Sequence, residues 1–239
     1  MVAVSEEDVK AQPTCPVCSG MGWRMTGRGA IRCDCMAETI ETRIERAGVP
    51  EAYRDAEIHQ LELANANGSL TDAVISCTTW LNAYPKAQRP GLLLVGPSGV
   101  GKTHLACAVL RALLERGHEC LYLDYLESLE AMRNEMRESN LEHRLMDAAC
   151  SAEVLLWDDL GAQRATDWTE DTVTSVVNHR YNHRQSMILT TNLSDREDPN
   201  KIVSSLSDRI GNRSVSRIME ACLVIRVSGP DYRLKRKLM

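Results

Sequence analysis

Phenylalanine is absent from this chain of 239 residues, so leucine, valine, isoleucine, methionine and alanine must fill its core. The core can still be substantial, because 44% of the residues are hydrophobic. The sequence lacks any apolar run close to the roughly 18 residues that a membrane span needs. The acidic, polar segment 1–13 also lacks the pattern of a signal peptide. We therefore expect a cytoplasmic protein that does not contact a membrane.

Positive charge is scarce as well, since the formal net charge is −5. That balance argues against a chain that coats nucleic acid through bulk charge, although a local basic groove remains possible. The length allows one α/β domain of about 180 residues with a small appendage.

Histidine is missing from the first 58 residues, where four of the nine cysteines gather in two close pairs, Cys15 with Cys18 and Cys33 with Cys35. A disulfide framework is not expected in a cytoplasmic chain. Four thiolates in two pairs suit a tetrahedral structural zinc with no open position for catalysis. A redox pair or reduced free thiols is the alternative. The other cysteines stand in apolar surroundings and are expected to be small core residues: Cys77, Cys107, Cys120, Cys150 and Cys222.

Short aliphatic runs alternate with longer amphipathic stretches from residue 91 onward. The runs at 91–95, 120–125, 154–157, 187–191 and 222–227 are typical of buried parallel strands. Helical stretches at 102–116, 126–136 and 169–184 lie between them. This alternation predicts a doubly wound α/β sheet. Ahead of it, 38–47 and 69–84 are expected to be helical, with breaks at Val49-Pro50 and Arg89-Pro90.

A phosphate-binding loop is predicted between the first of these runs and the helix after it. Its glycines let the backbone wrap an anion, and the N-terminus of the helix adds favourable charge. Lys102 is expected to reach the β- and γ-phosphates, and the Thr103 hydroxyl to ligate Mg²⁺. The loop that binds ATP or ADP is Gly96, Pro97, Ser98, Gly99, Val100, Gly101, Lys102 and Thr103.

Polar residues follow two later strands. Asp158 and Asp159 end the run at 154–157, where Asp158 is expected to hold Mg²⁺ and Asp159 to act as general base on the attacking water. Asn192 ends the run at 187–191, on the side of the sheet where a nucleotide crevice is expected. An ordinary acidic strand end and a capped turn are the plainer alternatives for these two positions.

Arginines at positions 209, 213 and 217 are spaced four apart, so a helix would carry them on one face. A solvated basic face is the usual explanation. Phosphoryl transfer, however, needs a cation against the charge of the transition state, and a neighbouring subunit often supplies it. Arg213 is our first candidate for that role and Arg217 our second.

Taken in order, these motifs resemble the AAA+ ATPases that load bacterial replicative helicases, the DnaC/DnaI type, and the related IstB group. The resemblance rests on residues 91–105, 155–161, 189–192, 209–218 and 229–233, together with the cysteine pairs and residues 47–54. It implies a five-stranded parallel sheet flanked by helices, a small N-terminal zinc module and no C-terminal lid domain. The domains would be a zinc-binding, helicase-interaction module at 1–48, a linker and helical lead-in at 49–88, and the ATPase domain at 89–239.

The resemblance also assigns roles to residues. It makes Lys102 and Thr103 the Walker A pair, Asp158 and Asp159 the Walker B acids, and Asn192 the first sensor. It makes Arg213 an arginine finger acting in trans and Arg233 a second sensor, and it extends the nucleotide site to His104. Since many AAA+ proteins place Glu where Asp159 stands, hydrolysis is expected to be slow.

The resemblance further implies a replicative helicase hexamer as partner, an ATP-dependent oligomer, and single-stranded DNA bound by a helical insertion at about 126–149. That insertion holds three arginines and six acidic residues, a poor electrostatic groove. Arg133 and Arg137 are the candidate contacts within it. Other interpretations are an IstB-like ATPase that assists a transposase, an ATP-switched adaptor with weak hydrolysis, and a small-molecule kinase.

Overall fold

The computed structural model of the chain describes residues 17–19, 23–26, 29–32, 39–58, 60, 68–137, 144–163, 165–193 and 205–235. The chain divides into two compact units, Met1–Arg43 and Ile44–Met239. In the first, β1 (Trp23–Thr26) pairs antiparallel with β2 (Gly29–Arg32). Cys18 lies buried in a turn. The other three expected zinc ligands, at positions 15, 33 and 35, lie outside the described residues, so the zinc site stays a prediction.

The second unit is built on one parallel sheet with the strand order β4-β5-β6-β3-β7. The three central strands are buried along their whole length, which is typical of a sheet covered on both faces. The edge strands are partly exposed. The five strands confirm the predicted fold: β3 (Gly91–Val95), β4 (Cys120–Asp124), β5 (Val154–Asp158), β6 (Ser186–Thr191) and β7 (Cys222–Arg226).

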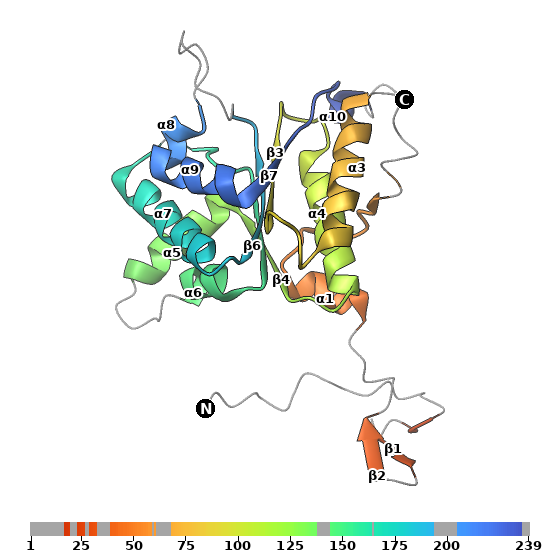
Figure 1. The fold of residues 1–239 in the computed structure, drawn as a ribbon. Helices are drawn as coiled ribbons and strands as arrows, with labels where there is room; N and C mark the ends of the chain where they lie inside the picture. Colours follow the sequence, from red (N-terminus) through yellow and green to blue (C-terminus); the bar gives the residue numbers. More distant parts are fainter. Residues whose placement is uncertain are drawn as a thin grey trace. The chain divides into compact units, whose positions relative to one another are not determined.

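Helices cover both faces of this sheet (Figure 1). On one face lie α3 (Gly68–Ala83) and α4 (Lys102–Glu115). On the other lie α5 (Tyr125–Arg137), α6 (Arg144–Ser151), α7 (Asp167–Asn182), α8 (Ser207–Ile210) and α9 (Asn212–Ala221). The remaining short elements are α1 (Ile40–Arg46), the 3-10 turn η2 (Glu51–Tyr53) and α10 (Tyr232–Lys235). Within the described residues, no helix is both long and apolar enough to span a bilayer.

The core does without phenylalanine by packing aliphatic side chains around two aromatic ones. Trp157 on β5 and Tyr125 on α5 are fully buried, with ring centroids 5.7 Å apart. The Trp157 indole N–H donates to Ser128 Oγ at 3.0 Å, which satisfies its polar atom in the interior. Three of the five scattered cysteines, Cys77, Cys107 and Cys222, are buried as expected, whereas those at 120 and 150 are only half-buried.

Candidate active site

The expected phosphate loop joins the carboxyl end of β3 to the first turn of α4. Gly96 packs so closely against the chain after β7 that an added Cβ would come within 1.9 Å of the Val227 carbonyl oxygen. Gly99 and Gly101 have φ angles of +77° and +98°, which residues with a Cβ rarely adopt. The loop therefore requires glycine at these three positions. Its backbone wraps the N-terminus of α4, where an anion is favoured.

The Lys102 side chain reaches into this loop and is buried. Its Nζ donates to the Pro97 carbonyl oxygen at 2.8 Å and to Asn192 Oδ1 at 2.7 Å. Burial lowers the pKa of Lys102, while the carboxylates of Asp159 and Asp158 oppose that shift. The ammonium group is thus fixed within the loop, where the oxygens of a triphosphate could replace its present acceptors.

The carboxylate of Asp158, at the end of β5, accepts hydrogen bonds from three hydroxyl groups. Thr103 Oγ1 and Thr190 Oγ1 donate to Oδ1 at 3.0 and 2.5 Å, and the Tyr122 hydroxyl donates to Oδ2 at 3.2 Å. Asp158 is only 7% exposed, and a buried carboxylate is tolerated where it is hydrogen-bonded in this way. The adjacent hydroxyl of Thr103 and carboxylate of Asp158 are hard oxygen ligands that fit Mg²⁺ beside a nucleotide.

Asp159 follows with a φ of +58°, a left-handed conformation that is uncommon for a residue with a side chain. Its N–H donates to Thr190 Oγ1 at 2.8 Å, and its Oδ1 accepts from Asn192 Nδ2. Burial raises the pKa of Asp159, the charge of Asp158 raises it further, and Lys102 opposes both. A raised pKa makes the carboxylate a stronger proton acceptor, as a general base requires.

The segment after β7 lies against the phosphate loop. Tyr232 N–H donates to the Gly99 carbonyl oxygen at 3.0 Å, and a Cβ on Gly99 would lie 2.0 Å from Asp231 Oδ1. Arg233 is exposed on α10, and its N–H donates to Asp231 Oδ1 at 2.9 Å. After burial and the two carboxylates, the charge of Arg233 also acts on the pKa of Lys102 and lowers it. The structure thus brings Arg233 near the phosphate loop.

The lead-in segment before α3 packs against α4 just beyond the phosphate loop. The His104 ring lies edge-to-face with the Tyr53 ring of η2, with centroids 6.4 Å apart. Arg111 of α4 donates to the Arg54 carbonyl oxygen at 2.7 Å and pairs with Glu57 at 3.6 Å. His104 therefore faces the lead-in segment.

The arginines at 209, 213 and 217 do not share one helix face, so this prediction from their spacing was wrong. The helix breaks at Gly211, whose φ of +79° separates α8 from α9. Arg209 lies on α8, whereas Arg213 and Arg217 lie on α9. Arg213 is exposed in the first turn. Arg217 lies over the Tyr181 ring, with its Cζ 5.8 Å from the centroid, and donates to the Arg213 carbonyl oxygen at 3.3 Å.

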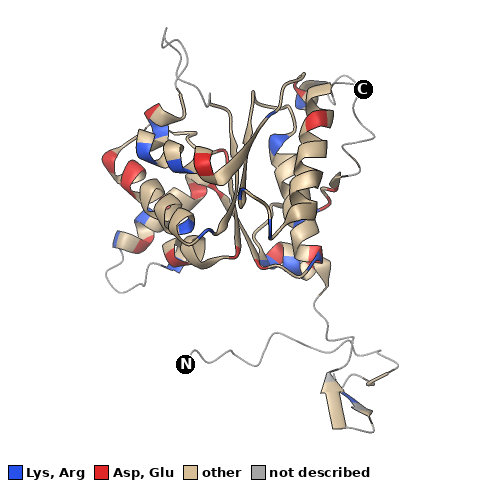
Figure 2. Ribbon diagram, viewed as in Figure 1, with Lys and Arg blue, Asp and Glu red and all other residues tan. Residues whose placement is uncertain are grey.

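Helix α5 carries the two arginines that the sequence offers as DNA contacts. The Arg133 guanidinium lies 4.4 Å from the centroid of the Trp168 ring. Arg137 is exposed in the last turn. Figure 2 shows acidic and basic positions interspersed over the helices of this layer. A cavity of about 260 Å³ on α5 is lined by Leu126, Leu129, Glu130, Arg133 and Gln163.

Residues 58–239, most of the second unit, match the family described as IstB-like ATP binding protein. The chain belongs to the IstB-like ATP-binding family. The family and the parallel five-stranded fold that the sequence predicts are thereby confirmed.

This member of the IstB-like ATP-binding family is similar to proteins named as replicative helicase loaders. The replicative helicase loader DnaC of Escherichia coli (strain K12) is 26% identical over 228 residues, which cover 86% of each chain. The replicative helicase loader DnaI of Bacillus subtilis (strain 168) is 28% identical over 162 residues, or 65% of this chain and 52% of DnaI. A crystal structure of the DnaC helicase loader is 27% identical with a TM-score of 0.66, covering 75% of this chain and all of that one.

Two site residues of this IstB-like protein, Tyr122 and Thr190, were not predicted from the sequence. The register of β4 and β5 pairs Tyr122 with Leu156, two residues before Asp158. Side chains two apart lie on the same face of a sheet, so Tyr122 reaches the carboxylate from the neighbouring strand. The alternation of side chains along a strand would have indicated the contact between Tyr122 and Asp158, but only once β4 was known to lie beside β5.

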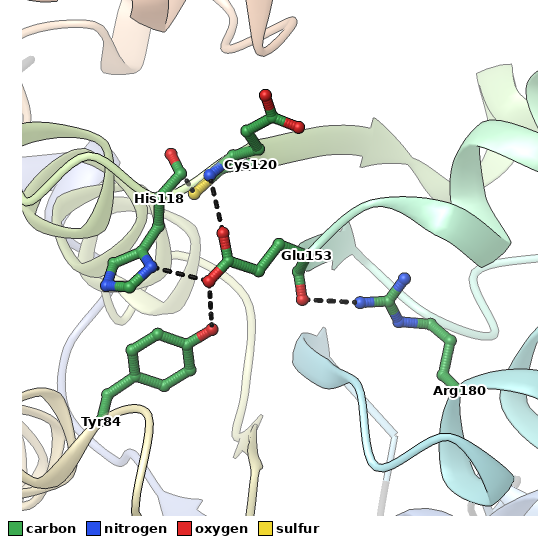
Figure 3. A network of polar contacts seen from close by, with 6 residues as sticks. Tyr84, His118, Cys120, Glu153 and Arg180 are labelled. Atoms are coloured by element: carbon green, nitrogen blue, oxygen red, sulfur yellow. Dashed lines mark hydrogen bonds and ion pairs between the residues drawn. The ribbon is translucent and has the colours of Figure 1, made fainter.

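A second polar network lies at the opposite, amino edge of the sheet (Figure 3). The Glu153 carboxylate is 2.7 Å from His118 Nδ1 and accepts from the Tyr84 hydroxyl at 3.3 Å and from the Glu119 N–H at 3.1 Å. Cys120 Sγ points to the His118 carbonyl oxygen at 3.9 Å. The contacts of this cluster join the starts of β4 and β5 to the end of α3.

Glu153→Gln is expected to weaken the fold at pH 7 and to lose that effect in acid. Partial burial opposes ionisation, but hydrogen bonds from Glu119, His118 and Tyr84 outweigh it and hold the pKa of Glu153 below its ordinary value of 4.5. A depressed carboxyl pKa stabilises the fold above about pH 4.5, and that stabilisation is lost as pH falls through the lower, folded value. The measurement is the urea midpoint of parent and variant at pH 7 and pH 3.5.

The matched control for this experiment is Glu119→Gln, one strand away with an exposed side chain. It should leave the midpoint near the parent value at both pH values. An equal midpoint difference between Glu153→Gln and the parent at pH 7 and pH 3.5 would show that the ionised carboxylate is not the stabilising group.

Proposed function

We propose that this protein is an ATPase that loads the replicative DNA helicase onto single-stranded DNA during DNA replication. The observation that carries the proposal is the match to the DnaC helicase loader, at 27% identity and over the whole of that chain. The similarity to DnaC and DnaI in sequence supports the same function. The site geometry supports the ATPase part, because it brings together a phosphate loop, a hydroxyl-held carboxylate and a candidate base.

In this proposal the loop at 96–103 binds the triphosphate through its N–H groups and the Lys102 ammonium. Thr103 and Asp158 would hold Mg²⁺, which would neutralise negative charge on the phosphates. Asp159 accepts the proton of the attacking water, and Asn192, which contacts both Lys102 and Asp159, orients that water. Arg233 contributes positive charge that acts on both Lys102 and Asp159.

Hydrolysis in this proposal depends on self-association. Arg213 is exposed, and among the described residues it makes no contact with the phosphate loop of its own chain. A second copy would place Arg213 against the phosphate of its neighbour, so that ATP binding assembles protomers and hydrolysis releases them. Arg217 is the second candidate for this role.

The N-terminal cysteines hold a structural zinc in this proposal, with Cys15, Cys18, Cys33 and Cys35 as ligands. The module they form, with the helix after it, binds the helicase. Arg137, exposed at the end of α5, is the candidate single-stranded DNA contact, with Arg133 as the second. The protein acts in the cytoplasm.

The test is co-elution with the replicative helicase of the host, measured with ATP, ADP and no nucleotide. Deletion of residues 1–38 removes the cysteine pairs and leaves the compact second unit, which begins at Ile44, intact. We expect a complex that is lost on this deletion, and helicase retained on closed circular single-stranded DNA only with ATP. Absence of any complex under all nucleotide conditions would overturn the proposal.

A second candidate function is assistance to a transposase, the role that the resemblance to the IstB group implies for a member of the IstB-like family. Both functions use the same ATPase core, so the site geometry does not separate them. The discriminating result is the partner: co-elution with a transposase, and not with the helicase, would favour the second. ATP binding without turnover in a single-turnover assay would instead favour an ATP-switched adaptor.

A further inference from the structure

The two oxygens of the Asp158 carboxylate are held from different sides. Thr103 and Thr190 both donate to Oδ1, at 3.0 and 2.5 Å. The only described donor to Oδ2 is the Tyr122 hydroxyl, at 3.2 Å. Rotation of the carboxylate about its last bond would exchange the two oxygens, and the tyrosine opposes that rotation because it holds the second one.

Tyr122 is suited to act as a permanent donor. Its side chain is 7% exposed, on β4 beside the strand that carries Asp158. A tyrosine hydroxyl has an ordinary pKa of about 10, so it carries its proton at physiological pH and can donate to the carboxylate.

The backbone of Tyr122 is fixed from the outer side of the sheet. Its N–H donates to the Ala47 carbonyl oxygen at 2.7 Å, so the turn after α1 pairs with the edge strand β4 at this residue. The turn that makes this possible uses Gly48, whose φ is +80° and whose added Cβ would lie 3.2 Å from the Tyr122 carbonyl oxygen. Tyr122 thus has a fixed backbone as well as a buried ring.

We propose that Tyr122 is a positioning residue for the magnesium site: its hydroxyl holds Oδ2 of Asp158 so that Oδ1 stays beside the Thr103 hydroxyl. This inference rests on the proposed nucleotide site and adds a residue to it. Residues that orient a metal-binding carboxylate without touching the metal typically change metal affinity by 10–100-fold when removed.

The test compares Tyr122→Phe with Tyr125→Phe. Tyr125 is a matched control, because its hydroxyl is also buried and has no hydrogen-bond partner among the described residues. Binding of a fluorescent ATP analogue is measured at equilibrium by anisotropy as Mg²⁺ is titrated, with Mn²⁺ binding followed by electron paramagnetic resonance. Neither readout depends on turnover, and thermal melting checks that both variants fold.

We expect Tyr122→Phe to raise the Mg²⁺ concentration at half-effect about 10-fold, with nucleotide affinity in EDTA unchanged. Tyr125→Phe should match the parent in both measurements. If Tyr122→Phe also matches the parent, or weakens nucleotide binding equally with and without Mg²⁺, the positioning role is overturned. If the parent itself binds no nucleotide, the proposed function fails instead, so the two failures are distinct.

Discussion

Arg213→Ala is expected to lower kcat for ATP about 10³-fold while leaving nucleotide affinity close to that of the parent. Arg213 is exposed on α9 and makes no contact with the phosphate loop of its own chain among those described. Its loss should therefore act only on the transition state reached in an assembled oligomer. Steady-state ATPase rates across a range of protein concentrations, with equilibrium nucleotide binding, measure the two effects separately.

A mixture of Arg213→Ala and Lys102→Ala tests whether the arginine acts between copies. Each variant alone lacks one half of the site, but a mixed interface can join an intact phosphate loop from one copy to an intact Arg213 from the other. We expect partial recovery of turnover in the mixture and none in either variant alone. Recovery would be absent if the arginine acted within its own chain.

The two neighbouring arginines serve as controls for this prediction. Arg217→Ala should lower kcat less than Arg213→Ala does. The Arg217 guanidinium already lies over the Tyr181 ring and donates to the backbone of its own helix. Arg209, on the separate helix α8, lies beside Gly161 in the turn after Asp158 and Asp159. If Arg209→Ala lowered kcat strongly while Arg213→Ala kept the kcat of the parent, the role of arginine finger would belong to Arg209.

The sheet and the phosphate loop could be predicted because each depends on short-range patterns. Five aliphatic runs separated by amphipathic stretches leave few topologies open, since crossovers between parallel strands follow one hand. The segment 96–103 indicates a phosphate loop because the strand before it and the helix after it can both be predicted from the sequence. Asp158, Asp159 and Asn192 were predicted as site residues for the same reason, because they are polar residues directly after predicted strands.

The rest depends on contacts between distant residues. Spacing alone favoured one helix over 209–217, but Gly211 breaks it, and the Glu170 carboxylate from α7 occupies the space where a Cβ at Gly211 would lie. In the sequence Tyr122 is an ordinary strand residue. Its contact with Asp158 becomes evident only when β5 is placed beside β4. In both cases the deciding neighbour is more than 30 residues away, which periodicity does not reveal.

Arg180 is the clearest example of such a hidden role. It reads as a surface arginine on an amphipathic helix, yet its exposure is 0%. Its guanidinium donates to the carbonyl oxygens of Ala149 at 2.8 Å and Cys150 at 3.4 Å, near the C-terminus of α6. It also donates to those of Glu153 at 3.3 Å (Figure 3) and Ser186 at 2.6 Å, at the starts of β5 and β6. A cation is favoured at a helix C-terminus, where the carbonyl dipoles compensate its charge.

Arg180→Met is therefore expected to destabilise the protein by about 3–5 kcal/mol, because it fills similar volume but leaves buried carbonyl groups without a donor. Burial lowers the pKa of Arg180 to about 10, so the parent side chain remains charged at pH 7 and the loss includes its interaction with the α6 dipole. Arg180→Lys, which restores one charged donor, should recover part of the loss. Urea unfolding at pH 7 measures all three proteins, with Arg137→Met as an exposed control expected within about 0.5 kcal/mol of the parent. A loss below about 1 kcal/mol in Arg180→Met would mean that water or neighbouring N–H groups satisfy these carbonyls, and that the arginine does not hold α6 to the sheet.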